Sequence, residues 1–280
     1  MIEAAQTERA GRLLALHRGP GILVLPNAWD AASARLFEEE GFPAIATTSA
    51  GVANALGFPD GERVPFLEMV AAVKRIARAV RVPLTADIES GFGQTAQEVG
   101  ENVRAVLEAG AVGVNLEDGT GVQASPLAPI VLHSERVRAA REAGTAAGID
   151  LVINARTDVY LDAVGEPATR FDEAVRRVNA YRKAGADCLF VPGVADAETI
   201  ERLVAAIDGP LNVLATAATP SVRELQRLGV ARVSLGSAPM RASLGLLRRI
   251  ARELHGTGSY DALTEGALSY SEANGLFTRS

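Results

Sequence analysis

The chain has 280 residues, of which 48% are hydrophobic and 22% are charged, and its formal net charge is -6. This composition is ordinary for a soluble globular protein, and an acidic chain without a basic run argues against a nucleic-acid-binding surface. The single cysteine, Cys188, excludes an intrachain disulfide. Residues 1–9 are polar and unlike a signal peptide, and no apolar run approaches the roughly 20 residues of a membrane span, so we expect a cytoplasmic protein.

Eight short apolar segments predict strands, and an amphipathic helix is expected after each of them. The strands are expected at residues 22–26, 44–48, 84–89, 112–117, 151–155, 187–191, 211–215 and 232–235, and the helices at 31–40, 66–80, 96–109, 134–147, 169–184, 197–207, 220–228 and 240–254. Eight alternating pairs predict an α/β fold, a (β/α)8 barrel of the TIM type. An open doubly wound sheet is the alternative, but no Gly-x-Gly-x-x-Gly motif follows the first strand.

No linker-like segment interrupts this pattern, so residues 1–280 are expected to form a single barrel domain, with 256–280 as a helical extension. Residues two apart on a strand share a face. Val114 and Leu116 therefore lie opposite Asn115 and Glu117. If the apolar face packs on the helices, the polar residues point into the barrel and gather at the carboxyl ends of the strands, where barrel active sites are built.

The stretch 85–93 ends the third expected strand with two acids, Asp87 and Glu89. On a regular strand the two carboxylates share a face and lie about 7 Å apart. That spacing suits a Mg²⁺ ion that one carboxylate holds directly and the other holds through water. The alternative is a strand end that carries two solvated acids.

Other strands also end in polar residues, which favours the metal site. Glu117 brings a third carboxylate to the same mouth, where like charges repel unless a cation lies among them. All-oxygen ligands select Mg²⁺ or Mn²⁺. Arg156 offers a planar fork for the carboxylate or phosphonate of a bound anion. Alternatively, Arg156 only forms ion pairs with Asp87, Glu117 or Asp158.

Five motifs then resemble a known family. They are Pro26-Asn27-Ala28-Trp29-Asp30, Thr48-Ser49-Ala50-Gly51 with Leu56-Gly57-Phe58-Pro59-Asp60, Asp87-Ile88-Glu89-Ser90-Gly91-Phe92-Gly93, Asn115-Leu116-Glu117-Asp118 and Asn154-Ala155-Arg156-Thr157-Asp158. In this order they resemble the isocitrate lyase/phosphoenolpyruvate mutase superfamily, from about residue 20 to the C-terminus. The resemblance implies a (β/α)8 barrel whose last helices are exchanged between subunits, usually in homotetramers.

The resemblance also implies a site and its roles. Magnesium is expected near Asp87, with Glu89 and Glu117 as water-mediated ligands, and the substrate is expected to be a small anionic keto or hydroxy acid or its phosphonate. Substrate contacts are expected from Trp29, Ser49, Ala50, Gly51, Asp87, Arg156 and Asn212, and Asp60 is expected on a gating loop as one of the catalytic residues with Arg156 and Glu117.

The loop after Glu117 departs from the family pattern. Residues 119–129 contain neither the catalytic cysteine segment of the lyases nor the lysine and asparagine of the mutases. Cys188 lies within an expected strand and does not replace that cysteine. His133 is the imidazole nearest this loop and is a candidate general acid, although it could instead precede the helix expected at Ser134. A loop of this length is often a lid over an active site.

We therefore expect a Mg²⁺-dependent lyase or hydrolase that cleaves a C–C bond of a small 2-hydroxy- or 2-keto-(di)carboxylate through a metal-stabilised enolate. One alternative is a mutase or hydrolase that acts on the P–C bond of phosphonopyruvate or a carboxyphosphonate. Another is a barrel that binds a metabolite without turnover.

Overall fold

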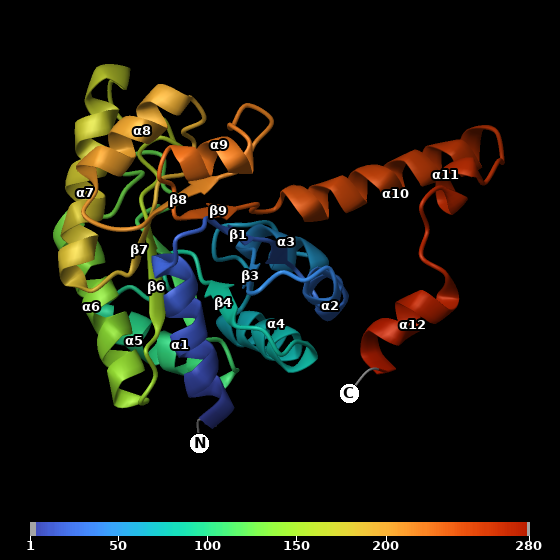
Figure 1. The fold of residues 1–280 in the computed structure, drawn as a ribbon, viewed down its shortest axis with the longest axis horizontal. Helices are drawn as coiled ribbons and strands as arrows, with labels where there is room; N and C mark the ends of the chain where they lie inside the picture. Colours follow the sequence, from blue (N-terminus) through green and yellow to red (C-terminus); the bar gives the residue numbers. More distant parts are fainter. Residues whose placement is uncertain (1–3, 279–280) are drawn as a thin grey trace.

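The computed structural model describes residues 4–278, in which strands and helices alternate along the chain (Figure 1). Residues 1–3 and 279–280, the ends of the expected domain 1–280, lie outside the described residues. The strands are β1 Leu23–Leu25, β2 Asn27–Ala28, β3 Ile45–Thr47, β4 Leu84–Asp87, β5 Gly113–Glu117, β6 Val152–Arg156, β7 Cys188–Phe190, β8 Leu211–Leu214 and β9 Arg232–Ser234. The helices are α1 Ala4–Arg18, α2 Ala31–Glu39, α3 Ser49–Ala55, α4 Phe66–Ala79, α5 Ala96–Glu108, α6 Ile130–Ala146, α7 Arg170–Ala184, α8 Ala197–Ala206, α9 Val222–Arg227, α10 Ala238–Gly256, α11 Asp261–Thr264 and α12 Tyr270–Thr278, with a short 3₁₀ helix at Pro167–Thr169.

The strands form one parallel sheet in the order β1-β9-β8-β7-β6-β5-β4-β3-β2. β1 and β2 lie on either side of Pro26, which has no N–H group to donate. Because β1 pairs with β9 and β2 pairs with β3, the segment 23–28 joins the two edges of the sheet and closes the barrel. The expected (β/α)8 barrel is confirmed, and the first of its eight strands is divided into two short pieces.

The two faces of β5 have the polarity that strand alternation predicts. Val114 and Leu116 are fully buried in the apolar core around the barrel. Asn115 points into the barrel, where its Oδ1 atom accepts a hydrogen bond of 2.8 Å from Asn154 Nδ2 on β6. The inside of the barrel is therefore polar where it approaches the carboxyl ends of the strands, as the sequence predicted.

Helix α1 was not among the expected elements, and it covers the end of the barrel at which the strands begin. The Nε2 atom of Gln6 donates hydrogen bonds to the carbonyls of Leu107 (2.7 Å) and Ala111 (3.0 Å), just before β5. Leu13 is fully buried in the core. The buried face of α1 also includes His17, so polar residues interrupt the apolar stripe by which an amphipathic helix is recognised.

Two other helices differ from expectation near the mouth of the barrel. The short helix α3 was not expected, and it begins directly after β3, where the Thr48 side chain accepts from the backbone N–H of Gly51. Helix α6 begins at Ile130, after Pro129, and not at Ser134 as expected. His133 therefore lies within the first turns of a helix rather than in the loop before it.

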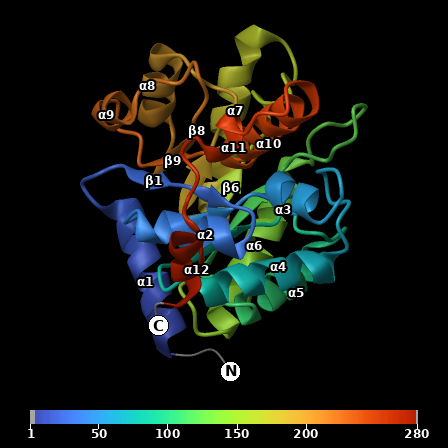
Figure 2. The ribbon, with the colours of Figure 1, turned by 90° about the vertical axis from the view of Figure 1, so that its right-hand side faces the viewer.

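The C-terminal helices leave the body of the barrel. Helix α10 extends outward, α11 lies near its far end, and α12 returns toward α2 (Figures 1 and 2). The Nε atom of Arg35 on α2 donates a hydrogen bond of 2.6 Å to the carbonyl of Leu276 on α12. Two helices thus occupy the extension that was expected to be helical. None of the helices in residues 4–278 is both long enough and apolar enough to cross a membrane.

Candidate active site

A cavity of about 220 Å³ lies at the carboxyl ends of the strands. It contains five of the residues expected from the sequence, namely Ser49, Ala50, Asp60, Asp87 and Arg156. Its other lining residues are Asn27, Thr48, Asn115, Leu161, Phe190, Pro192, Leu214, Ser234, Gly236 and Ser237. The volume lies below the roughly 300–1,000 Å³ of pockets for drug-sized ligands, so the cavity suits a small molecule.

Asp87, at the end of β4, is held from both sides by its neighbours. Its backbone N–H donates to Thr47 Oγ1 (2.8 Å), and its Oδ2 atom accepts from the backbone N–H of Ser49 (2.9 Å). Its other carboxylate oxygen, Oδ1, is buried and has no hydrogen-bond partner in residues 4–278. Buried polar atoms without a partner are uncommon, so this oxygen calls for a ligand.

Glu89 does not continue the strand, so the argument that Asp87 and Glu89 share a strand face was wrong. β4 ends at Asp87, and Glu89 has a φ of 50°, which is left-handed backbone. The buried side chain of Glu89 accepts a hydrogen bond from the backbone N–H of Glu62 through Oε2 (2.7 Å). Its Oε1 atom is the second buried carboxylate oxygen here that lacks a partner among the described residues.

The acids of this region raise one another's pKa values. Burial, followed by the charges of Asp60 and Asp87, raises the pKa of Glu89 to about 8. Burial and the charge of Asp87 also raise the pKa of Asp60. Burial raises the pKa of Glu117 well above its ordinary value, although Arg156 opposes the shift. A cation among these groups would favour their ionised forms.

The donor atoms fit a hard divalent cation. They are carboxylate oxygens, the ligands of Mg²⁺ and Mn²⁺, and the oxygens Asp87 Oδ1 and Glu89 Oε1 have no hydrogen-bond partner among the described residues. Among residues 4–278, no three or more His, Cys, Asp or Glu side chains converge as a direct ligand set. Mg²⁺ usually keeps several waters and takes one or two carboxylates directly. These residues therefore fit a hard divalent cation that Asp87, Glu89 and Glu117 would hold.

Arg156 ends β6, and its guanidinium reaches two acids as well as the cavity. It donates to Asp158 from Nε (2.5 Å) and Nη2 (3.0 Å), and Nη1 lies 2.6 Å from Glu117 Oε2. The ion pairs that were the alternative interpretation of Arg156 are thus present. Because Arg156 also lines the cavity, these pairs fix its orientation and do not exclude an anion.

Six expected residues lie outside the lining of the cavity, namely Glu89, Glu117, Trp29, Gly51, Asn212 and His133. Trp29 is half-buried against a second apolar cluster, and Gly51 packs beside it, where a Cβ atom would lie 2.9 Å from Trp29 Cβ. Asn212 is fully buried and donates to Ser234 Oγ (3.1 Å). His133 is also fully buried. Its ring lies 4.4 Å from that of Tyr181, and neither ring nitrogen has a hydrogen-bond partner in residues 4–278. We therefore leave His133 out of the proposed chemistry.

The other lining residues differ in whether the sequence could have revealed them. Asn115 shares a strand face with Glu117, so alternation could have identified it. Leu161, Phe190, Pro192 and Leu214 give the cavity an apolar portion, and apolar residues at strand ends carry no signal that separates them from core residues. Ser237 follows β9 in a turn before α10 and has no motif of its own.

Comparison with known sequences and structures agrees with this geometry. The sequence model of the family described as "Phosphoenolpyruvate phosphomutase" matches residues 13–255. An oxaloacetate decarboxylase of Rhodopseudomonas palustris is 32% identical over 213 residues, which cover 74% of this chain and 71% of the relative.

Solved structures share the fold over nearly the whole chain. A structure from Burkholderia cenocepacia J2315, assigned as a lyase or mutase, has a TM-score of 0.92 and is 37% identical, covering 99% of this chain and 98% of its own. A phosphonopyruvate hydrolase solved with oxalate and Mg²⁺ has a TM-score of 0.84 and is 26% identical, covering 96% of this chain and 94% of its own.

Proposed function

Because the chain belongs to the phosphoenolpyruvate phosphomutase family, we propose that it is a divalent-metal-dependent lyase that cleaves a C–C bond of a small 2-keto or 2-hydroxy (di)carboxylate. One observation carries this proposal: Arg156 lines the same small cavity as the Asp87 carboxylate, one oxygen of which has no partner in residues 4–278. A fixed cationic fork and a cation-binding acid together suit a substrate that carries a carboxylate and a keto or hydroxyl oxygen.

The residues of the site have separate roles in binding the substrate and the metal ion. Arg156 binds the anionic end of the substrate, and Ser49 and Ala50 position its carboxylate at the start of α3. Asp87, Glu89 and Glu117 would hold the ion. When bound, Mg²⁺ supplies a Lewis acid that stabilises negative charge on the substrate oxygen as the bond breaks.

For a 2-keto acid such as oxaloacetate that loses CO2, the electron pair of the broken C–C bond stays on the carbon next to the keto group, and that carbon then takes a proton. For a 2-hydroxy acid, the hydroxyl proton leaves as its carbon becomes the keto carbon of one fragment, and the electron pair passes to the carbon of the other fragment, which takes a proton. We assign the proton transfer to Asp60, because it lines the cavity and burial raises its pKa. The group that moves the proton must lie within hydrogen-bond reach of the reacting carbon or contact it through one water. His133 does not line the cavity and is not needed for this step.

The assembly belongs to the same proposal. We infer a homo-oligomer, a tetramer by resemblance, in which α10 to α12 pack against a second copy. The outward course of α10 supports this (Figure 1). The side chains of Leu244 and Leu247 on this helix are 48% and 58% accessible, which supports it as well. Clusters of exposed apolar side chains are typical of protein interfaces.

A phosphonate substrate is the second candidate, and the structural similarity to phosphonopyruvate hydrolase favours it. The same cavity would hold a phosphonate at Arg156, since the guanidinium fork matches phosphonate as well as carboxylate oxygens. A barrel that binds a metabolite without turnover is the third candidate.

One set of assays separates the three candidates. Purified full-length protein with Mg²⁺ is incubated with oxaloacetate, alkyl-substituted malates and phosphonopyruvate. Release of pyruvate, oxalate or glyoxylate is followed enzymatically, and phosphate release is followed by phosphorus NMR. We expect C–C cleavage that EDTA abolishes and that the Asp87→Asn and Arg156→Gln variants lose. Phosphate release alone would favour the second candidate, and tight Mg²⁺-dependent oxalate binding without any product would favour the third.

A further inference from the structure

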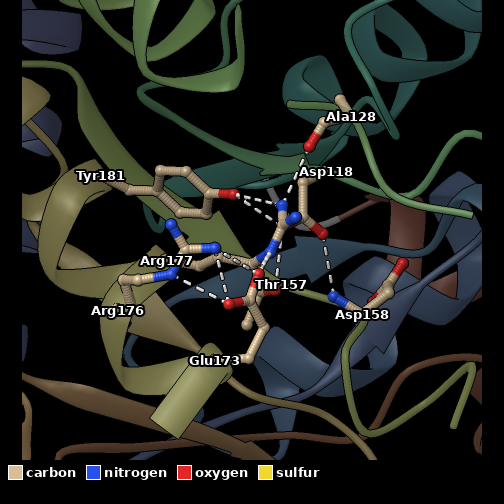
Figure 3. Close-up of polar contacts among 8 residues, drawn as sticks. All are labelled: Asp118, Ala128, Thr157, Asp158, Glu173, Arg176, Arg177 and Tyr181. Atoms are coloured by element: carbon tan, nitrogen blue, oxygen red, sulfur yellow. Dashed lines mark hydrogen bonds and ion pairs between the residues drawn. The ribbon is translucent and has the colours of Figure 1, made fainter. Parts of the chain in front are cut away.

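Asp118 follows Glu117 directly, but its side chain leaves the cavity and is completely buried between the barrel and α7 (Figure 3). Its Oδ2 atom accepts hydrogen bonds from Tyr181 OH (2.6 Å), Thr157 Oγ1 (2.8 Å) and Arg177 Nη1 (3.0 Å). Its Oδ1 atom accepts from the backbone N–H of Asp158 (3.0 Å). One cation would be enough to neutralise the charge of this buried carboxylate, yet four donors bind it.

One side of this cluster reaches the proposed substrate-binding arginine. Asp118 holds the side-chain hydroxyl of Thr157 and the backbone N–H of Asp158, and the Asp158 carboxylate in turn fixes the Arg156 guanidinium with two hydrogen bonds. A change at Asp118 therefore moves Arg156 through a single intervening residue. Buried hydrogen-bond networks of this kind hold their members more firmly than separate pairs do.

The other side reaches the base of the loop 119–129. The Ala128 N–H donates to the Asp118 carbonyl (2.8 Å), and the Ala128 carbonyl accepts from Arg177 Nη1 (2.9 Å). At the same base, Gly119 at the start of the loop pairs with Leu127 near its end in an antiparallel bridge. Gly119 also packs on Asp158, since a Cβ atom placed on Gly119 would lie 2.6 Å from Asp158 Oδ2.

We propose that Asp118 is a positioning residue that links the orientation of Arg156 to the closed base of the loop 119–129, with Arg177 and Tyr181 as its supports. The link makes a ligand at Arg156 and order in the loop mutually dependent. The inference rests on the proposed function only in assigning ligand binding to Arg156. The contacts from Thr157 to Ala128 do not depend on that assignment.

The chain offers a matched pair for the test, because Arg176 and Arg177 are neighbours on α7 and both pair with Glu173 (Figure 3). Arg177 also reaches Asp118, whereas the Arg176 side chain is 65% accessible. Arg177→Gln is the test variant, Arg176→Gln is its control, and Arg177→Lys is the conservative variant. Tyr181→Phe removes one donor to Asp118 and keeps the ring, so it serves if Arg177→Gln does not fold.

The first measurement uses oxalate as the probe, with Mg²⁺ and the full-length chain. We expect Arg177→Gln to weaken oxalate binding about tenfold by calorimetry. In the wild type, saturating oxalate should slow hydrogen–deuterium exchange of residues 119–129, and in Arg177→Gln this protection should be lost even at saturation. Arg176→Gln should keep both properties, and Arg177→Lys should recover part of each. Unchanged affinity and unchanged protection in Arg177→Gln would overturn the proposal.

The second measurement needs no ligand and therefore separates this inference from the proposed function. Thr157→Val removes a donor on the β6 side of Asp118, and we expect it to speed exchange in residues 119–129 several-fold. The same substitution should add nothing in the Arg177→Gln background, because the link is already broken there. If Thr157→Val leaves loop exchange unchanged, the link does not exist, whatever the chain binds. If the wild type does not bind oxalate, the proposed function fails and this measurement still decides the link.

Discussion

The guanidinium of Arg156 donates two hydrogen bonds to the carboxylate of Asp158, at 2.5 and 3.0 Å. These two hydrogen bonds place the remaining nitrogen, Nη1, beside Glu117, and the planar guanidinium lines the cavity. A lysine keeps the charge but cannot donate the two parallel hydrogen bonds to Asp158 that orient the ligand-binding group. The Arg156→Lys variant should therefore bind oxalate about ten- to a hundredfold more weakly, on the basis of about 1.5–3 kcal/mol for charge-assisted hydrogen bonds. Titration calorimetry measures this, and Arg202→Lys, a substitution of an exposed arginine on α8, should match the wild type.

Removal of the Asp87 charge should affect the Tm of the protein in opposite ways with and without Mg²⁺. The charge of Asp87 raises the pKa values of Asp60 and Glu89, so Asp87→Asn relieves repulsion in the metal-free protein. We expect its Tm without metal to equal or exceed that of the wild type. Addition of Mg²⁺ should raise the Tm of the wild type but not that of the variant, because the direct ligand is gone.

Differential scanning fluorimetry with and without EDTA measures both effects. The control is Asp150→Asn, which changes an exposed acid between α6 and β6 and should keep the Mg²⁺ response. An Asp87→Asn variant that Mg²⁺ still stabilises fully would place the ion elsewhere.

Two buried histidines should make the protein less stable in acid. Burial, and for His17 also the charge of Arg232, lowers the pKa values of His17 and His133 from 6.5 to about 4. In the unfolded chain these groups bind protons near pH 6.5, whereas in the folded chain they do so only near pH 4. The stability is therefore fully present above pH 6.5, and it falls as the pH drops from about 6.5 to about 4, by at most about 3 kcal/mol for each group.

Urea unfolding between pH 4 and pH 8 measures this slope. His133→Leu should reduce the loss of unfolding free energy at acid pH by about the contribution of one histidine. The variant removes a buried imidazole whose ring nitrogens have no hydrogen-bond partner in residues 4–278. His255→Leu, on the exposed face of α10, should leave the slope unchanged. A slope that is the same in all three proteins would contradict the assignment of His133.

The exposed leucines of α10 should matter for assembly rather than for folding of the barrel. Leu247 is 58% accessible on a helix that extends away from the body of the molecule. A charge there would be buried at the proposed interface without a partner. Leu247→Glu should therefore reduce the molar mass measured by light scattering while leaving the circular dichroism spectrum unchanged. Leu67→Glu, which alters an accessible leucine on α4, should keep the wild-type mass.

The alternation of strands and helices could be predicted because each element carries its own periodicity. All eight strands and the eight helices that follow them occur in the structure. Local backbone conformation could not be predicted. Glu89 has a left-handed backbone, so strand alternation does not give the direction of its side chain. Its carboxylate nevertheless lies near Asp60 and Asp87. Helix α1 was missed because Gln6 and His17 lie on its buried face.

The acids at the strand ends could be identified as candidates from their positions, but their partners could not. Asp118 looks like one more strand-end acid in the sequence, and its contacts depend on the register of α7 against the barrel. His133 looks like a loop residue only if α6 begins at Ser134. Because α6 begins four residues earlier, at Ile130, His133 lies within the helix and its ring packs against Tyr181.

Helix α1 also has a consequence for the order of events in turnover. Its buried side chains Ala10 and Leu13 cover the end of the barrel where the strands begin, so the cavity communicates with solvent through the opposite mouth. Both fragments of a cleaved substrate must then leave by the path through which it entered. We propose that the fragment held at Asp87 departs only after the one nearer the mouth. Release should therefore be ordered, with the inner fragment a competitive inhibitor and the outer fragment a noncompetitive one.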